Sequence, residues 1–171
     1  MKKSIVLFLF IVGFASAGKS QTVSGQYKDL VDKISTKAQD KGPAARLIEF
    51  AKTMIGVPYR YASSNPSIGF DCSGFVSYVF RNFGFATPRS SSEFNDAGTP
   101  VKLENAKVGD ILVFTGTNVR KRIAGHVGII AKIDGDTIQF IHSTSGKTHG
   151  VTVTTLNAYY KSRFMKAVSL F

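Results

Sequence analysis

One cysteine and three histidines are the residues of this sequence best suited to acyl-transfer chemistry. Cys72 is the single cysteine, and the histidines are His126, His142 and His149. A thiolate is a strong nucleophile, and a neighbouring imidazole can take up and return its proton. A lone cysteine cannot form a disulfide within the chain. Cys72 is therefore a reactive thiol, a partner in a bond between chains, or a small buried side chain.

The residues around Cys72 predict that its thiol lies at the start of a helix. Asp71 has a suitable side chain for a helix N-cap, and Cys72, Ser73 and Gly74 would form the first turn. Free N–H groups and the helix dipole favour negative charge there, so we expect a lowered pKa for Cys72 and a place for an oxyanion. A structural role stays open, because position 72 falls on the same side of the helix as Phe75.

Two of the histidines fall in segments that we predict to be neighbouring strands. His126 begins a strand between Gly125 and Gly128, where missing side chains would let a backbone or ligand approach the imidazole. A three-residue hairpin loop at 133–135 would place His142 directly opposite His126, where it could orient the imidazole. A two-residue loop would shift the pairing by one residue and turn His142 to the other face.

A zinc site is the rival use of the same side chains. Cys72, His126 and His142 are suitable types for a three-ligand site. However, no C-x-x-C, H-E-x-x-H or other paired-ligand spacing accompanies them, nor is there a Gly-rich phosphate loop or a G-x-S-x-G motif. His149 lies in a polar loop and is predicted to be exposed. The motifs therefore favour thiol chemistry without a metal.

Helices come first in this chain and strands come last. Pro43 would open a helix that ends at Gly56, and a second helix would run from Cys72 to Gly84. Strands are predicted at residues 111–114, 126–132, 137–142 and 151–155, with a short turn and a last strand within 159–170. Loops are predicted at 57–66, at 115–125 and, with a short helix, at 87–100. This order predicts an α+β fold, with N-terminal helices packed on an antiparallel sheet.

The first residues carry the three marks of a secretory signal. Met1-Lys2-Lys3 is basic, residues 5–14 are mostly apolar, and Ala15-Ser16-Ala17 fits a signal-peptidase site. The apolar run is only about half the ~20 residues that a membrane-spanning helix needs. We expect a signal peptide at 1–17, a flexible leader at 18–42, one domain at 43–171, and no integral membrane segment after cleavage.

The chain is strongly basic, with 22 Lys and Arg against 11 Asp and Glu. Lys2 and Lys3 fall in the predicted signal peptide, so the remainder has 20 basic and 11 acidic residues, a net charge of +9. Such charge favours anionic polymers. An exported protein rarely meets nucleic acid, whereas bacterial wall peptides carry carboxylates. Simple solubility is the other explanation, and charge alone does not separate the two. The basic residues are scattered, and the densest cluster, 120–122, is too short for a binding arm.

Six segments, taken in order, resemble the NlpC-type family of papain-like bacterial cell-wall cysteine peptidases. The resemblance covers residues 44–171, nearly all of the predicted mature chain. Each segment is weak alone, and their order and spacing together are specific. The segments are 56–61 (GVPYRY), 69–76 (GFDCSGFV), 88–90 (PRS), 108–114 (VGDILVF), 125–129 (GHVGI) and 140–143 (FIHS).

The resemblance implies a fold, a reaction and a set of site residues. It implies a papain-like fold with the nucleophile at a helix N-terminus, and a reaction that needs no metal or organic cofactor. The implied substrate is peptidoglycan or its muropeptides, cut between D-glutamate, through its γ-carboxyl, and the following diamino acid. The implied nucleophile, base and third catalytic residue are Cys72, His126 and His142, and the implied substrate-binding residues are Tyr61, Asp71 and Ser73.

Three departures and three alternatives accompany this interpretation. Ala62-Ser63 stands where Gly-Gly is frequent in the family, and Phe94 stands where Gln is common. The basic loop at 115–124 is longer than expected and would border the cleft, where it would affect substrate preference. The alternatives are an amidase, an acyltransferase of the same superfamily, or a non-catalytic wall-binding module. We expect an exported protein in the periplasm or cell envelope or outside the cell. We favour a monomer.

Overall fold

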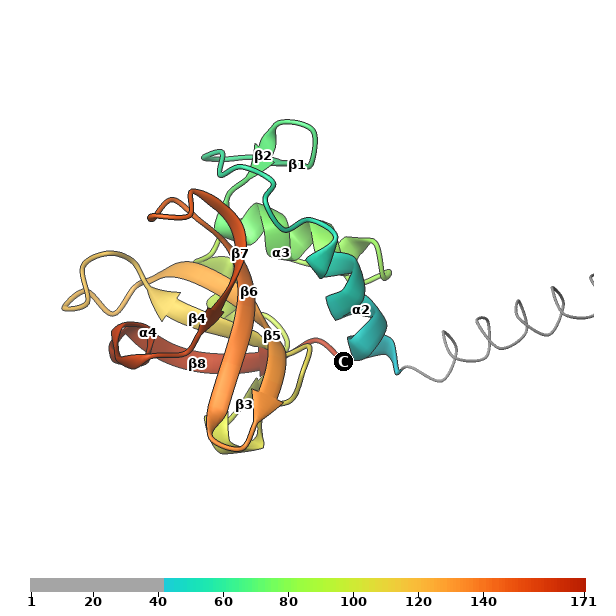
Figure 1. Cartoon of the computed structure of the whole chain (residues 1–171). Helices are drawn as coiled ribbons and strands as arrows, with labels where there is room; N and C mark the ends of the chain where they lie inside the picture. Colours follow the sequence, from blue (N-terminus) through green and yellow to red (C-terminus); the bar gives the residue numbers. More distant parts are fainter. Residues whose placement is uncertain (1–41) are drawn as a thin grey trace, which may run out of the picture. The chain divides into compact units, whose positions relative to one another are not determined.

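The computed structural model describes residues 42–171, so the predicted signal peptide and nearly all of the predicted leader lie outside the described residues. Figure 1 shows the order of the elements along the chain. The helices are α2 (Pro43–Lys52), α3 (Cys72–Arg81), η1 (Glu93–Asp96), η2 (Leu103–Asn105) and α4 (Ala158–Arg163). The strands are β1 (Ser64–Asn65), β2 (Gly69–Phe70), β3 (Thr99–Val101), β4 (Ile111–Thr115), β5 (Ala124–Asp134), β6 (Thr137–Thr144), β7 (Gly150–Thr155) and β8 (Phe164–Ser169).

Six of the strands form one antiparallel sheet in the order β3-β8-β4-β5-β6-β7. β1 and β2 make a separate two-stranded ribbon next to the start of α3. The two long helices, α2 and α3, lie on the same side of the sheet (Figure 1). The predicted α+β class with helices packed on an antiparallel sheet is confirmed.

Helix α3 is held on the sheet by its apolar face. Phe75, Val76, Val79 and Phe80 are fully buried, and they share one core with Val127 and other residues of the sheet. Burying each such side chain contributes roughly 1.5–3 kcal/mol. The helix start that carries Cys72 is therefore tied to the strand that carries His126.

A second apolar layer covers the other face of the sheet. Leu112 and Phe114 of β4 pack there with Phe140 of β6, and Tyr160 of α4 closes the layer. Because β4 is covered on both faces, all five of its residues are buried. This explains why residues 111–114 read as an unbroken apolar run rather than an alternating one.

The loop between β5 and β6 is shorter than predicted. Two residues, Gly135 and Asp136, connect the strands, and Gly135 has a positive φ of 53°. The predicted three-residue loop is therefore wrong, and so is the direct pairing of His126 with His142. If the pairing of β5 with β6 continued from this two-residue loop in regular register, His142 would lie on the opposite face of the sheet from His126.

A β-bulge in β5 returns the two histidines to one face. Between Ile130 and Lys132 the register shifts, so that Ala131 is an extra residue on β5. Beyond the bulge, Ile129 pairs with Ile141. In this register His142 is offset by two positions from the residue opposite His126, and both side chains share a face.

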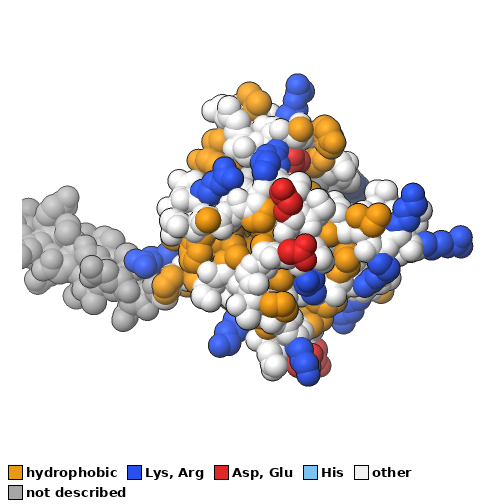
Figure 2. Space-filling model, turned by 180° about the vertical axis from the view of Figure 1, so that it is seen from behind, with side chains coloured by type: hydrophobic (Ala, Val, Ile, Leu, Met, Phe, Trp, Pro, Cys, Tyr) orange, Lys and Arg blue, Asp and Glu red, His pale blue; other side chains and the backbone are white. Residues whose placement is uncertain are grey.

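Basic side chains are spread over the surface. Figure 2 shows Lys and Arg distributed across one face of the molecule, with few acidic side chains between them. This distribution agrees with the scatter of basic residues along the sequence. Separately, none of the helices in residues 42–171 has the length and apolar character to cross a membrane.

Candidate active site

Asp71 caps the helix that carries Cys72. The Asp71 carboxylate accepts a hydrogen bond from the Gly74 backbone N–H at 2.6 Å, as the sequence predicted. Gly74 is required for close packing, because a Cβ there would lie 2.1 Å from the Ser63 carbonyl oxygen. The same carbonyl accepts the Asp71 N–H at 2.9 Å. These contacts lock the first turn of α3 and fix the position of the thiol.

The thiol of Cys72 is more buried than its place at a helix start suggested. Burial raises the pKa of Cys72, and the charge of Asp71 raises it further. The backbone N–H groups of Val127, Ser73 and Cys72 itself lie against the sulfur and lower its pKa in part. The predicted fall in the pKa is therefore wrong, because burial outweighs the helix start. The predicted N–H groups are nevertheless present beside the sulfur.

Three side chains from three adjacent strands form a hydrogen-bonded row. His126 Nε2 lies 2.8 Å from His142 Nδ1, and His142 Nε2 lies 2.9 Å from Thr154 Oγ1. His142 is fully buried and His126 is partly exposed. The expected contact between the two imidazoles is present, although the register that produces it differs. Thr154 was not among the predicted site residues.

The row admits one arrangement of ring protons in which His126 can act as a base. If His126 Nδ1 is to accept a proton, the proton of the neutral ring must sit on Nε2 and point to His142 Nδ1. His142 then carries its own proton on Nε2 and donates it to Thr154 Oγ1. One chain of donors and acceptors therefore leaves His126 Nδ1 free to act as a base.

Both histidines are held in the neutral form. Burial is the first cause that lowers the pKa of His126 well below its usual 6.5, and the neighbouring His142 and Arg163 lower it further. Burial, with the charge of Arg163, lowers the pKa of His142 to about 4. A neutral imidazole and a protonated thiol that line the same cavity are the resting arrangement from which general-base activation can start.

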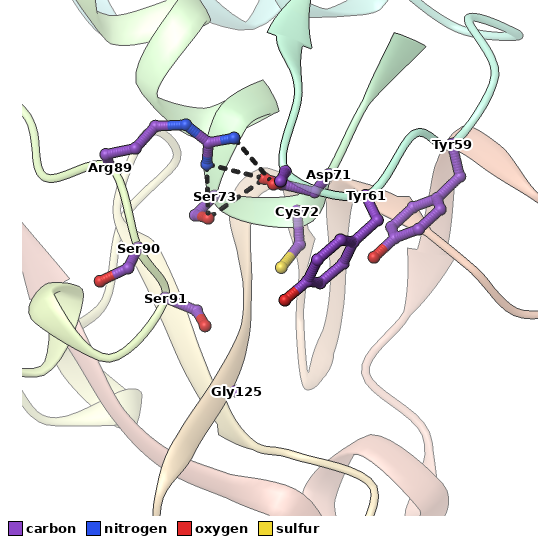
Figure 3. A pocket seen from close by; sticks show the side chains of 10 residues that line it. Tyr59, Tyr61, Asp71, Cys72, Ser73, Arg89, Ser90, Ser91 and Gly125 are labelled. Atoms are coloured by element: carbon purple, nitrogen blue, oxygen red, sulfur yellow. Dashed lines mark hydrogen bonds and ion pairs between the residues drawn. The ribbon is translucent and has the colours of Figure 1, made fainter.

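Arg89 links the residues on the other side of Cys72. Its guanidinium donates to both oxygens of the Asp71 carboxylate at 2.8 and 3.1 Å, and to the Ser73 hydroxyl at 3.3 Å (Figure 3). Asp71 and Ser73, both predicted to bind substrate, are thus partly engaged by Arg89. Arg89 itself lay within a segment singled out by its family resemblance, but no role was predicted for it.

Two cavities meet at Cys72, and Tyr59 and Gly125 also line both. The first, of about 460 Å³, also exposes Tyr61, Asp71, Ser73 and Arg89. The ring of Tyr61, which is 83% exposed, extends beside the Cys72 sulfur in Figure 3. The second cavity, of about 490 Å³, contains His126, Lys147, Thr154 and Arg163. Five of the six predicted site residues therefore line one of these cavities, and His142 lies behind His126.

The zinc alternative is poorly matched by this geometry. The facing nitrogens of His126 and His142 are bonded to each other and do not converge on a common point. Within residues 42–171, no three His, Cys, Asp or Glu side chains are grouped so as to hold a metal ion. His149, predicted to be exposed, is exposed and lies next to the ring of Tyr59.

A buried thiol at the start of a helix, packed on an antiparallel sheet that carries a histidine pair, defines a papain-like fold. The chain belongs to the NlpC/P60 family, whose sequence profile matches residues 56–169. The gamma-DL-glutamyl hydrolase of Bacillus subtilis is 37% identical over 119 residues, which are 68% of this chain and 27% of that protein. The Escherichia coli murein DD-endopeptidase MepS/murein LD-carboxypeptidase is 28% identical over 86% of this chain and 70% of its own length.

Solved structures agree with the family assignment. An NlpC/P60 family protein from Bacillus cereus superposes with a TM-score of 0.65 at 29% identity, over 75% of this chain and 40% of its own. The NlpC/p60 domain of the peptidoglycan hydrolase SagA gives 0.60 at 29% identity, over 75% of this chain and all of that domain. The match thus spans about a quarter of the Bacillus subtilis hydrolase and the whole of an isolated domain.

Proposed function

We propose that this protein is an exported cysteine endopeptidase that hydrolyses peptidoglycan stem peptides, at the bond between the γ-carboxyl of D-glutamate and the diamino acid. The observation that carries the proposal is the row from His126 through His142 to Thr154, in the cleft that holds the Cys72 thiol. A hydrolase from Bacillus subtilis that acts on gamma-DL-glutamyl bonds, by its name, supports the choice of bond.

In the proposed first half-reaction, His126 Nδ1 takes the thiol proton while the Cys72 sulfur attacks the γ-carbonyl carbon. Negative charge develops on the carbonyl oxygen, where the backbone N–H groups of Cys72 and Ser73 can donate to it, with the Tyr61 hydroxyl alongside. His126 then gives its proton to the leaving amine, the C–N bond breaks, and an acyl thioester remains on Cys72.

In the second half-reaction a water molecule attacks the thioester. His126 takes the proton of the water as the new C–O bond forms, and returns it to the Cys72 sulfur as the C–S bond breaks. His142 keeps the imidazole of His126 in the required tautomer and orientation. Asp71 and Ser73 bind the acyl part of the substrate in the first cavity, where Arg89 holds them in place.

Digestion of purified peptidoglycan tests this proposal. The protein should release fragments whose diamino acid has a free α-amine, as identified by mass spectrometry, and Cys72→Ala should release none while keeping the folded circular dichroism spectrum. Fragments cut only at a D-alanyl cross-link would contradict the bond proposed here and place the chain with a DD-endopeptidase. An active Cys72→Ala variant would contradict the mechanism, and a transferred acyl group in the products would indicate an acyltransferase.

A further inference from the structure

The second cavity carries positive charge without any carboxylate. Lys147 and Arg163 line it, and none of its lining residues is Asp or Glu. In the first cavity, by contrast, Arg89 is neutralised by its ion pair with Asp71 at 2.8 Å. The two sides of Cys72 therefore differ in charge, and the excess cation lies on the side of His126.

The position of His126 decides which part of a substrate enters that side. The leaving amine must receive its proton from the imidazole, so it has to lie against His126 when the C–N bond breaks. His126 lines the second cavity and not the first. Resting on the proposed function, the acyl part then occupies the first cavity and the released amino acid occupies the second.

The two cations of the second cavity differ in how the fold holds them. Arg163 is buried, donates to the Thr115 carbonyl at 2.9 Å, and lies over the ring of Tyr159 at 5.0 Å. Lys147 is exposed in the loop between β6 and β7, and no carboxylate within residues 42–171 pairs with it. Arg163 thus supplies a fixed charge, and Lys147 supplies a mobile ammonium that has no partner.

The loop that carries Lys147 is braced against the cleft. The Gly146 N–H donates to the Thr144 hydroxyl at 3.0 Å, and the Tyr59 N–H donates to the His149 carbonyl at 3.0 Å. Tyr59 is also one of the residues shared by the two cavities. The ammonium of Lys147 is therefore presented at the cavity by a loop tied at both ends.

We infer that the second cavity is a subsite for a leaving amino acid that bears a free carboxylate, with Lys147 as its specificity-determining residue. A diamino acid with a second carboxyl group fits this chemistry. The same residue with that carboxyl amidated, or a diamino acid without it, loses the ion pair with Lys147. Hydroxyl groups around the cavity can hydrogen-bond to the carboxylate or to the amide. Only the negative charge of the carboxylate therefore distinguishes the two forms.

Cleavage of two matched tripeptides tests this inference. Both are L-alanyl-γ-D-glutamyl-diaminopimelate with the main-chain carboxyl of the last residue amidated, and the side-chain carboxyl of that residue is either free or amidated. We expect wild-type kcat/KM to favour the free acid roughly fivefold, the upper end for a solvent-exposed ion pair. Lys147→Met should lower kcat/KM for the free acid and bring the ratio towards one, and Lys147→Glu should lower the ratio further, while the charge of Arg163 stays in place.

The matched control is Lys102→Met, which removes an exposed ammonium that lines neither cavity and should keep the wild-type ratio. Equal rates for the two peptides in wild type, or an unchanged ratio in Lys147→Met, would overturn the inference. If neither peptide is cut, the proposed reaction fails instead. Calorimetry on Cys72→Ala then decides the subsite, because the free acid should still bind roughly fivefold more tightly than the amide.

Discussion

Thr154 completes the hydrogen-bond relay that runs from His126 through His142, because its hydroxyl accepts the last hydrogen bond of that row. Its hydroxyl lies 2.9 Å from His142 Nε2 and accepts in the arrangement that leaves His126 Nδ1 free. Without that acceptor, the buried N–H at His142 Nε2 would have no hydrogen-bond partner. If His142 carried its proton on Nδ1 instead, that proton would face the proton on His126 Nε2. Thr154 is thus a positioning residue, which acts on the chemistry through two imidazoles.

Thr154→Val should lower kcat/KM roughly tenfold, the cost of one unpaired buried donor. Thr154→Ser, which keeps the hydroxyl, should recover most of the loss. Nitrogen-15 shifts of the His142 ring should report a changed tautomer in the valine variant only. Thr155→Val makes the same change at an exposed position of β7 and should behave as wild type. A fully active Thr154→Val would remove Thr154 from the relay.

The pKa of Cys72 was predicted wrongly from its local sequence. Helix position alone predicted a lowered pKa, whereas burial of the thiol raises it. The local sequence shows the cap and the first turn but not the strand that covers the sulfur. Arg89 was missed for a related reason, since its partner Asp71 is 18 residues away and only the fold brings the two together.

At the scale of elements, glycine governs how closely the strands behind the cleft approach. The sequence predicted that Gly125 and Gly128 leave room near His126. A Cβ on Gly125 would lie 2.6 Å from the Gly116 Cα, so that glycine admits another backbone. A Cβ on Gly128 would lie 2.6 Å from the Phe140 ring and 3.0 Å from the His142 Cβ. Gly128 therefore sets the distance between β5 and the second histidine.

Gly128→Ala should destabilise the protein by roughly 1–3 kcal/mol, since the new methyl group overpacks a buried site. It should also lower activity by more than the loss of folded protein, because His142 has to move. Denaturant titration and kcat/KM measured on the folded fraction separate these effects. Gly116→Ala adds the same methyl group where nothing lies within 4 Å, so both quantities should stay close to wild type. Equal behaviour of the two variants would show that Gly128 has no spacing role.

The bulge at Ala131 is a feature of β5 that the sequence did not predict. The helices that begin at Pro43 and Cys72, and the main strands, were predicted from apolar periodicity and turn residues, and all are present. The register between β5 and β6 was wrong, because a bulge leaves no reliable mark in the alternation of side chains. The shorter loop and the bulge together leave the pairing two residues away from the predicted register, so the two histidines still share a face and meet.

At the scale of the whole molecule, two neutral histidines, of which His142 is fully buried, couple folding to pH. The pKa of His142 is about 4 in the folded protein and about 6.5 when unfolded. Between these values the unfolded chain binds more protons, so stability falls as the pH drops from 6.5 towards 4. Above the unfolded pKa this contribution is fully present. The lowered pKa of His126 acts in the same direction.

His142→Gln should flatten this acid-side decline. The wild-type free energy of unfolding should fall more between pH 7 and pH 4.5 than that of the variant, by a difference on the order of 3 kcal/mol at most. Chemical denaturation at several pH values measures both slopes. His149→Gln alters an exposed histidine and should keep the wild-type slope. Parallel slopes for wild type and His142→Gln would show that His142 is not buried in the neutral form.

The sequence by itself determined the class of fold, the thiol at a helix start and the pair of histidines, because caps, apolar periodicity and residue types act locally. The tertiary structure alone decided four features: the raised pKa of Cys72, the Arg89–Asp71 pair, the end of the relay at Thr154 and the charge of the cavity around Lys147. Each depends on segments far apart in the chain, whose burial and distances exist only after the sheet has formed.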